Sequence, residues 1–315
     1  MDAKKIIDKR YLLLDTLGSG GFGTVYKVFD LSNKREYALK LMNNKYSVFI
    51  NEIKINKIIK PFNNRFFIKY IDSNTYAYLS EKKSEQYDSY IVFELASKGD
   101  VIKYITHDKL GLNERLSKYF FSKILQIVIS LHRIGICHRD LKLDNFLFDG
   151  ENFTLKLSDF GFSSLIIRNK LGKVKKQRGS YGTKSYKAPE VVLENEEPKG
   201  YDGEKADIFS LGVILFSLRT CRIGFIEATS NDDFYKNIID GKISEYWSLL
   251  KKNGIDGLTE EFKNLYIKLV SPNPKNRPTL EQIYNDEWLK EIRDLSEEEL
   301  DNYEKELIAE LKKRE

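Results

Sequence analysis

Residues 138–145 have the sequence His138-Arg139-Asp140-Leu141-Lys142-Leu143-Asp144-Asn145, in which a carboxylate is followed by a lysine after two positions and by an amide after five. A match to six specified positions arises by chance at a rate on the order of 10^-8 per starting point. Further along the chain come Asp159-Phe160-Gly161 and then Ala188-Pro189-Glu190. Three such motifs in this order exclude coincidence.

A glycine-rich motif, Gly18-Ser19-Gly20-Gly21-Phe22-Gly23, lies near the start of the chain. Its pattern, G-x-G-x-x-G, is weak evidence alone, and a dinucleotide-binding fold would require a helix directly after it. Residues 24–29 have a strand pattern instead, and the next strand carries a lysine in Tyr37-Ala38-Leu39-Lys40. We therefore expect a β-hairpin whose glycines let backbone N–H groups approach phosphates.

Together these motifs resemble the eukaryotic protein kinase family, from about Tyr11 to Ile292. Lys142, with Gly182-Thr183 before the Ala-Pro-Glu motif, resembles the serine/threonine branch, and the segments 182–190 and 205–213 are most similar to the calcium/calmodulin-dependent and related kinases. The resemblance implies a two-lobed α+β fold. It also implies transfer of the γ-phosphoryl group of ATP, with Mg²⁺, to Ser or Thr hydroxyls of protein substrates.

By this resemblance, the centre of the reaction lies at residues 140–145 and their partners. Asp140 would orient the substrate hydroxyl and accept its proton, Lys142 would contact the γ-phosphate, and Thr183 would hydrogen-bond this pair. Asn145 and Asp159 would supply the hard oxygen atoms that hold Mg²⁺ on the phosphates. No D-x-D-x-D-G loop is present, so we expect no calcium sensor in this chain.

Lys40 would hold the α- and β-phosphates and complete the catalytic set together with Glu52. Glu52 is the only acid between Lys40 and Asp72, so it is expected to orient the lysine. The interval of 12 residues between them is shorter than is usual in the family. Asn56 lies where the family usually has an apolar residue, and we expect this polar side chain to cost packing.

The resemblance also implies a nucleotide-binding set. The backbone at Glu94 and Ala96 would hydrogen-bond adenine, with Phe93 behind it, and Asp100 would meet the ribose. The purine would lie between Val25, Ala38 and Leu147. The complete set is Leu17, Gly18, Ser19, Gly20, Gly21, Phe22, Gly23, Thr24, Val25, Ala38, Lys40, Glu94, Ala96, Asp100 and Leu147.

Regulation is expected in the segment before Gly182. Arg139 clamps an activating phosphate in the family, but Gly179 stands at the usual phosphorylation position and Ser180 beside it. One hypothesis is that phosphorylated Ser180 orders this segment through Arg139 and nearby lysines. The alternative is a basic loop that attracts acidic partners. The basic residues are Arg168, Lys170, Lys173, Lys175, Lys176 and Arg178.

The pattern along the chain indicates a β-rich N-lobe (1–96), a helical C-lobe (97–293) and a C-terminal helical extension (294–315). Strands are expected at 11–17, 24–29, 36–42 and 91–95, and a helix at 48–59. Helices are expected at 116–131, 208–218, 234–239, 262–270 and 280–292, with Asp207 at the start of the apolar one. The extension has one apolar stripe, and we expect it to lie on the domain or to bind a regulatory partner.

Composition supports a large folded domain without covalent staples. The chain has 315 residues, 41% hydrophobic, and a net charge of +5. Its two cysteines, Cys137 and Cys221, have no C-x-x-C spacing, and the start of the chain lacks the apolar core of a signal peptide. A cytoplasmic or nuclear location is expected, with no membrane span and no nucleic-acid partner.

Two questions stay open at this point. A pseudokinase, which keeps the fold and binds nucleotide or partners without turnover, is the alternative to an enzyme. The set Lys40, Asp140, Asn145 and Asp159 is complete, which argues against it. Asn56 and the short interval between Lys40 and Glu52 keep it open. Peptide preference is the other question: Asp100 and Asp144 match acids that select basic residues upstream of the acceptor, while Ser217 stands where a third acid is common.

Overall fold

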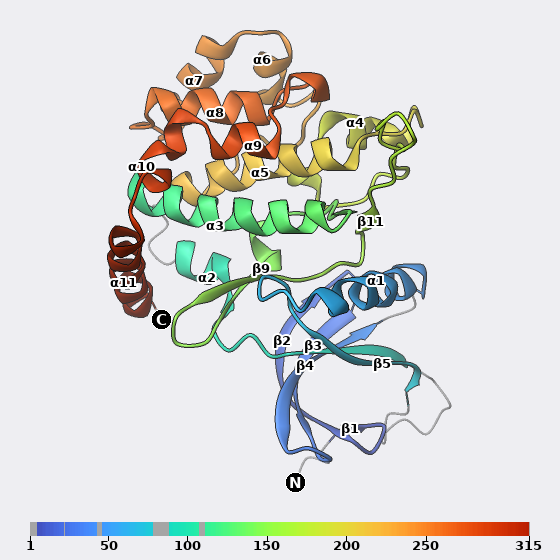
Figure 1. The fold of residues 1–315 in the computed structure, drawn as a ribbon. Coiled ribbons are helices and arrows are strands. Elements are labelled where there is room, and N and C mark those ends of the chain that lie inside the picture. The colour runs from blue at the N-terminus through green and yellow to red at the C-terminus, as the bar shows by residue number, and fades with distance from the viewer. Residues whose placement is uncertain (1–4, 22, 43–45, 78–87, 107–110, 315) are drawn as a thin grey trace. The chain divides into compact units, whose positions relative to one another are not determined.

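The computed structural model describes residues 5–21, 23–42, 46–77, 88–106 and 111–314 (Figure 1). Contacts between residues divide the chain into two compact units. The first contains residues 1–99 and 147–161, and the second contains residues 100–146 and 162–315. The segment 147–161 therefore belongs with the N-terminal unit although it follows residues 138–145 in the sequence.

The first unit is built on a six-stranded sheet in the order β1-β2-β3-β4-β6-β5, in which every neighbouring pair is antiparallel. The unit also contains the helix α1 (Tyr46–Ile59), the short strand β10 (Thr154–Leu157) and residues 147–149 of β9 (Phe146–Asp149). The six strands are β1 (Ile6–Ile7), β2 (Tyr11–Gly20), β3 (Gly23–Asp30), β4 (Arg35–Met42), β5 (Tyr70–Ala77) and β6 (Asp88–Phe93).

Alternation of apolar and polar residues puts one set of side chains from each strand into a common core. Tyr11 from β2, Val28 from β3 and Leu39 from β4 are fully buried there against Tyr90 and Val92 of β6. The expected strands and the helix at 48–59 are present, most of them extended by one to three residues, whereas the strand expected at 91–95 runs from Asp88 to Phe93 and leaves Glu94 and Leu95 outside it. β5 was not expected.

The second unit is mainly helical and centres on α3 (Glu114–Arg133) and α5 (Gly203–Thr220), which pack against each other. Figure 1 shows them side by side in green and yellow. None of the helices in the described ranges is both long and apolar enough to cross a membrane. The remaining helices are α2 (Val101–Ile105), α4 (Pro189–Val192), α6 (Tyr235–Ile239), α7 (Ile243–Lys252), α8 (Glu260–Leu269), α9 (Leu280–Tyr284), α10 (Lys290–Arg293) and α11 (Glu297–Lys313).

Three helical expectations need correction. The buried helix begins at Gly203, not at residue 208, because Asp202 accepts hydrogen bonds from the backbone of Glu204 and Lys205 and caps it. Asp207 therefore lies inside the helix. The single helix expected over 280–292 is divided into α9 and α10 by a 3₁₀ turn, and α2, α4 and α7 were not expected.

The C-terminal helix α11 packs on the second unit through its apolar stripe. Tyr303, Leu307 and Leu311 are buried, and the ring of Tyr303 stacks on Tyr119 of α3 with centroids 5.6 Å apart. The guanidinium of Arg115 lies 4.0 Å from the centroid of the Tyr303 ring. The backbone carbonyl of Arg115 accepts a hydrogen bond from the Tyr303 hydroxyl. A capping box at Ser296 and Glu299 starts the helix.

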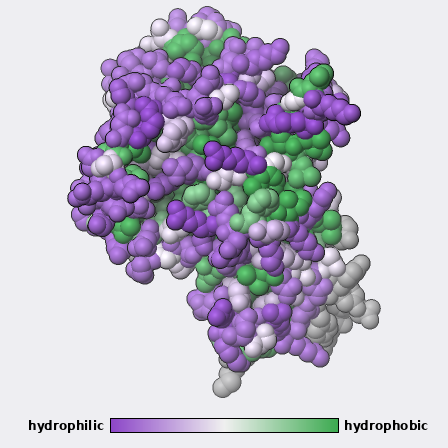
Figure 2. Space-filling view, in the orientation of Figure 1, coloured by the Kyte–Doolittle hydropathy of each residue, from purple (hydrophilic) through white to green (hydrophobic). Residues whose placement is uncertain are grey.

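Hydrophilic residues cover most of the face of the molecule seen in Figure 2, with hydrophobic residues showing in separate patches. Exposed apolar side chains of the second unit include Ile167, Leu171 and Ile226, which are 50%, 92% and 65% exposed. Leu171 is therefore almost entirely outside the core.

Candidate active site

The predicted site residues fall into two groups, one in each unit. In the first unit, β2 and β3 form the glycine-rich hairpin, with Gly18 opposite Val25 and Gly20 opposite Gly23. Gly23 has φ +141°, and a Cβ there would lie 2.0 Å from the carbonyl oxygen of Leu41, so the strand requires glycine at this position. A Cβ on Gly18 or Gly20 would meet no atom within 4 Å, which leaves room beside the backbone for a ligand.

Leu17, Ser19, Gly21 and Thr24 belong to the same hairpin, whereas Phe22 lies outside the described residues. Val25 pairs with Lys40 across β3 and β4. Ala38 is two residues before Lys40, so these three side chains project from the same face of the sheet. The predicted purine contacts and the phosphate-binding lysine are therefore adjacent on one surface.

Lys40 is bonded to two carboxylates within the first unit. Its Nζ lies 2.9 Å from Oε2 of Glu52 on α1 and 2.9 Å from Oδ1 of Asp159. Burial alone would lower the pKa of Lys40, but the two neighbouring carboxylates more than offset this effect and raise it. Lys40 therefore carries a permanent positive charge in a site of low dielectric constant.

Glu52 is fully buried, and burial raises its pKa to about 7 against the opposing effect of Lys40. Among the described residues its second oxygen, Oε1, has no hydrogen-bond partner. Asn56, one turn later, is also buried and donates from Nδ2 to the backbone carbonyl of Glu52 at 2.9 Å. This hydrogen bond reduces the cost of a polar side chain at position 56.

The segment after β10 is held against α1 by a hydrogen bond from Asn51 Nδ2 to the carbonyl of Gly161, at 2.9 Å. Asp159 has φ +60°, in the left-handed region that aspartate adopts more readily than most residues, and Phe160 is buried edge-on against Phe67. A Cβ on Gly161 would lie 2.9 Å from Val48, so a larger residue would push the segment away from α1. These contacts fix the carboxylate of Asp159.

The connector after β6 contains the predicted adenine contacts Glu94 and Ala96. The side chain of Glu94 accepts a hydrogen bond from Lys156 of β10 at 2.9 Å, and the backbone N–H of Glu94 donates to the carbonyl of Lys69. Leu147 of β9 is half-buried in the same unit. The sequence did not indicate Lys156, whose partner Glu94 is 62 residues away along the chain.

In the second unit, Asp207 of α5 holds the backbone that leads into the motif 138–145. Its two carboxylate oxygens accept hydrogen bonds from the N–H groups of His138 and Arg139, at 2.7 and 2.8 Å, and Oδ2 also contacts Nε2 of His132. Arg139, between these hydrogen bonds and Asp140, has φ +66°. Asp207 therefore braces this loop from within the helix.

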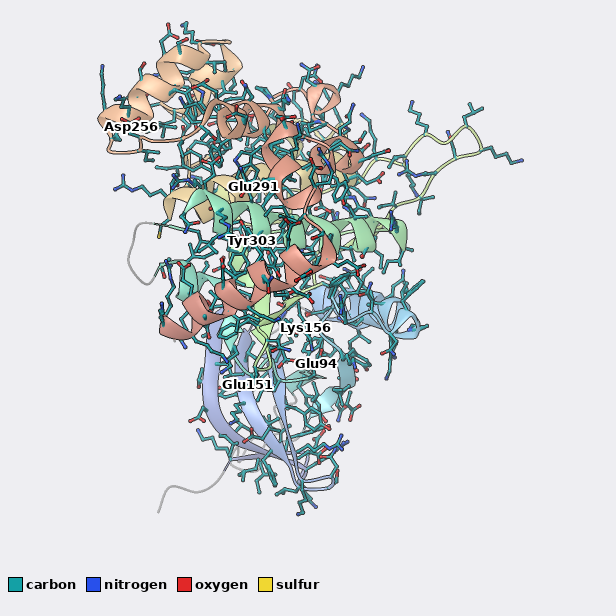
Figure 3. All side chains as sticks on the ribbon, turned by 60° about the vertical axis from the view of Figure 1, so that its left-hand side comes forward. Glu94, Glu151, Lys156, Asp256, Glu291 and Tyr303 are labelled. Atoms are coloured by element: carbon teal, nitrogen blue, oxygen red, sulfur yellow. The ribbon has the colours of Figure 1, made fainter. Side chains whose placement is uncertain are left out.

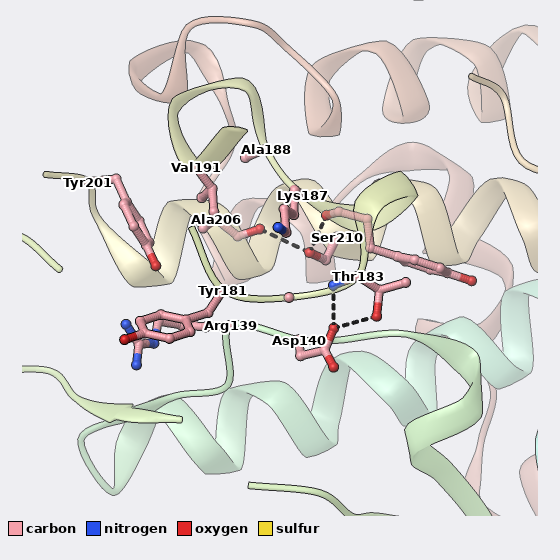
Figure 4. A pocket seen from close by; sticks show the side chains of 12 residues that line it. Arg139, Asp140, Tyr181, Thr183, Lys187, Ala188, Val191, Tyr201, Ala206 and Ser210 are labelled. Atoms are coloured by element: carbon pink, nitrogen blue, oxygen red, sulfur yellow. Dashed lines mark hydrogen bonds between the residues drawn. The ribbon is translucent and has the colours of Figure 1, made fainter. Parts of the chain in front are cut away.

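The side chain of Asp140 is fixed by Thr183. Oδ1 of Asp140 accepts hydrogen bonds from the backbone N–H and the hydroxyl of Thr183, at 2.7 and 2.8 Å (Figure 4). Lys142 Nζ lies 3.0 Å from the same hydroxyl and 3.5 Å from Oδ2 of Asp140. Gly182, at φ +108°, allows this approach, because a Cβ there would lie 2.7 Å from the carbonyl of Arg139.

A small pocket opens beside this cluster, between residues 181–191 and α5 (Figure 4). Ser210 of α5 donates to the carbonyl of Tyr186 at one wall. Lys187 lies 3.3 Å from the hydroxyl of Ser180 and 3.0 Å from its carbonyl. The sequence had not indicated Lys187, whose pKa is lowered by burial.

Arg139 is bonded to backbone carbonyls in this structure. It donates from Nε to the carbonyl of Phe162 at 2.6 Å and from Nη1 to that of Arg178 at 3.3 Å, and its guanidinium lies 4.8 Å from the ring centroid of Tyr181. The ring of Tyr181 in turn packs on Phe162. Ser180 thus contacts Lys187, whereas Arg139 contacts Tyr181.

The donors expected for Mg²⁺ fit the ion by their chemistry. Asn145 Nδ2 donates to the carbonyl of Asp140 at 2.8 Å, which fixes the orientation of its amide. Asp159 offers a carboxylate that already has a cationic neighbour in Lys40. Asn145 belongs to the second unit and Asp159 to the first, and each offers the hard oxygen donor that Mg²⁺ prefers.

Comparison with known families matches residues 11–289 to the protein kinase domain. The chain belongs to the protein kinase family. The match contains both groups of site residues and confirms the predicted family and its α+β kinase fold.

The serine/threonine branch is supported by relatives. The chain is 31% identical over 90% of its length to a human SNF-related serine/threonine-protein kinase, and the match covers 34% of that protein. It is 29% identical over 94% of its length to CBL-interacting protein kinase 26 of rice, covering 55% of it, and 28% identical over 86% to the serine/threonine-protein kinase chk1 of fission yeast, covering 54%. The chain thus spans about a third to half of these relatives.

Proposed function

We propose that this kinase domain transfers the γ-phosphoryl group of ATP to Ser or Thr hydroxyls of proteins. The observation that carries the proposal is the double hydrogen bond from Thr183 to Oδ1 of Asp140, with Lys142 on the same hydroxyl. A scaffold without turnover has no need to orient this carboxylate and this ammonium together. The matching relatives, which are named as serine/threonine kinases, support the same conclusion.

The proposed reaction uses the side chains as follows. Oδ2 of Asp140 hydrogen-bonds the substrate hydroxyl and receives its proton as the oxygen attacks the γ-phosphorus and the bond to ADP breaks. Lys142 and Lys40 stabilise negative charge on the phosphates. Asn145 and Asp159 would hold Mg²⁺, which neutralises phosphate charge when bound. Glu52 and Thr183 act as positioning residues.

The proposal is tested with radiolabelled ATP and a generic basic protein substrate. The purified chain should label the substrate, and Asp140→Asn and Lys40→Met should each lower kcat by about 100-fold or more. Asp240→Asn, an exposed aspartate on α6's C-terminal side, serves as the matched control and should keep full activity. Equal residual labelling in wild type and Asp140→Asn would establish the pseudokinase alternative.

We also propose a preference for substrates with basic residues upstream of the acceptor. Asp144 and Asp100 are both exposed. Asp100 also caps α2, since its side chain accepts a hydrogen bond from the N–H of Lys103 at 3.0 Å. Ser217 is buried and donates to the carbonyl of Val213, so it offers no acid. A peptide array should show enrichment of Arg or Lys that falls in Asp144→Ala, and an array without upstream enrichment rejects the preference.

Phosphorylation of Ser180 is a further proposal for regulation. A phosphate there would meet Lys187, 3.3 Å from the hydroxyl, and would attract Arg139 from its carbonyl partners. Mass spectrometry of active enzyme should find Ser180 modified, and Ser180→Ala should lower activity. Full activity of unmodified enzyme or of Ser180→Ala contradicts this.

A cytoplasmic or nuclear location and a regulatory partner of α11 also remain proposals. The apolar stripe of α11 is buried on α3, so a partner would have to bind the charged outer face or displace the helix. A pull-down that succeeds with the wild-type chain and fails with charge reversals at Glu298 and Lys305 would identify the outer face.

A further inference from the structure

Residues 167–175 form a β-hairpin that stands out from the second unit, which we call the basic hairpin. Backbone hydrogen bonds join Lys175 to Ile167 at 2.7 Å and Asn169 to Lys173 at 3.0 Å. Oδ1 of Asn169 also accepts the N–H groups of Leu171 and Lys173 and fixes the turn. In Figure 3 this pale yellow-green part of the chain projects away from the helices.

Basic residues at the base of the hairpin are tied to the rest of the unit. Arg168 forms an ion pair with Glu204 of α5, and Lys176 donates to the carbonyl of Lys199 at 3.1 Å. Arg178 pairs with the buried carboxylate of Glu194 at 3.4 Å. The base is thus held in place, so the turn is presented at a fixed position of the second unit.

The lysines nearer the turn differ from those at the base. Lys170, Lys173 and Lys175 are exposed, and among the described residues their side chains have no hydrogen bond or ion pair. Leu171 lies at the turn itself and is 92% exposed, and Ile167 is 50% exposed. The hairpin therefore presents an apolar residue surrounded by three unneutralised cations.

We propose that the basic hairpin is a docking surface for an acidic segment of a partner or substrate protein that also covers Leu171. The three exposed lysines are complementary in charge to carboxylates, and Leu171 at the fixed turn offers an apolar contact beside them.

A protein segment fits these features better than a lipid surface. Three lysines and one leucine give only marginal attachment to an anionic bilayer, which usually needs a second membrane signal. A bilayer also needs no defined turn, whereas Asn169 fixes this one through two hydrogen bonds. A shaped apolar contact on a protein makes use of that rigidity. Docking here needs no turnover, so it stands apart from the proposed phosphoryl transfer.

The test measures binding by fluorescence anisotropy at 150 mM salt, with a labelled peptide of Glu-Glu-Leu repeats and its Gln-Gln-Leu counterpart. The acidic peptide should bind the full chain, and the glutamine peptide should bind at least about 10-fold more weakly. Reversal of Lys170, Lys173 and Lys175 to Glu should weaken binding about 10-fold or more. Leu171→Asp should weaken it several-fold with the lysines intact.

A charge-matched control separates this surface from the general positive charge of the chain. Reversal of Lys252, Lys275 and Lys305, which are exposed and lie elsewhere on the second unit, should change binding less than about twofold. Equal weakening by both triple variants overturns the proposal, as does absence of binding to the acidic peptide. Binding to phosphatidylserine vesicles in its place would assign the hairpin to membranes and also overturn it.

Discussion

Lys156 Nζ lies 2.9 Å from Oε1 of Glu94, and the same ammonium lies 2.9 Å from Oδ2 of Asp149. Figure 3 shows Lys156 and Glu94 next to each other in the first unit. Asp149 also accepts hydrogen bonds from the backbone N–H and the hydroxyl of Ser97. One lysine on β10 therefore fixes both ends of the connector that is proposed to bind adenine.

Lys156→Met should raise KM for ATP about 5- to 10-fold with little change in kcat, because the connector loses its cation while Asp140 keeps its position. Burial alone would lower the pKa of Lys156, but the hydrogen bonds that it donates to Asp149 and Glu94 raise it, so the lysine is charged. Steady-state kinetics with ATP and with purine riboside triphosphate, which lacks the adenine amine, measure the effect.

The KM values for the two nucleotides should differ less in Lys156→Met than in wild type, since the hydrogen bonds between adenine and the connector are weakened. Lys156→Arg, which keeps the charge, should restore part of the difference. An equal loss of kcat for both nucleotides would show that Lys156 serves stability alone.

Thr183→Ala should lower kcat about 10- to 100-fold, because Oδ1 of Asp140 loses a hydrogen bond and Lys142 loses its contact. Thr183→Ser keeps the hydroxyl and should retain most activity. Thermal unfolding of both variants provides the control. If Thr183→Ala kept wild-type kcat at unchanged stability, the orientation of Asp140 would not depend on this hydroxyl.

Tyr303→Ala should destabilise the second unit by about 3 kcal/mol, since a buried ring stacked on Tyr119 and covered by Arg115 is lost. Tyr303→Phe removes only the hydrogen bond to the Arg115 carbonyl and should cost about 1 kcal/mol. Urea unfolding measures both changes, with the exposed Tyr284→Ala as control. A change within error for Tyr303→Ala would mean that α11 is detached in solution.

Stability should decrease at low pH through Asp30. Burial alone would raise the pKa of this carboxyl, but hydrogen bonds from Arg10 and Ser32 lower it to about 2. The stability that this ionised carboxylate contributes is therefore complete above its unfolded-state pKa of 3.8 and is lost as the pH falls through about 2. By pH 3 the loss should be about 1 kcal/mol, a figure limited by the 38% exposure of Arg10.

Urea unfolding between pH 6 and pH 3 tests this, with Asp30→Asn as the comparison. The variant is less stable at pH 6 and should show a smaller decrease toward pH 3. Parallel curves for the two proteins would assign the acid sensitivity to other carboxylates.

Motifs with local spacing made much of this fold predictable from the sequence. Asp140 and Asn145 lie within one short loop, so their proximity follows from the chain itself. Lys40 and Glu52 were paired because no other acid was available, and the structure places them 2.9 Å apart. The apolar run of α5 was visible, but its polar first turn hid the cap at Asp202.

Tertiary partners were harder to foresee. β5 has the sequence Tyr-Ile-Asp-Ser-Asn-Thr-Tyr-Ala, whose polar residues conceal a strand that is held by its pairing with β6. Lys156 is 62 residues from Glu94, and no spacing rule connects them. Lys187 contacts Ser180 only because the segment 180–187 folds back on itself.

The contacts of Arg139 set a thermodynamic limit on any modification of the neighbouring segment. A phosphate that recruits this guanidinium must first displace it from two carbonyls and from the face of Tyr181. The net gain is only the difference between the two sets of partners. Modification would therefore shift an existing equilibrium by degrees, and catalytic output would rise from a basal level instead of starting from zero.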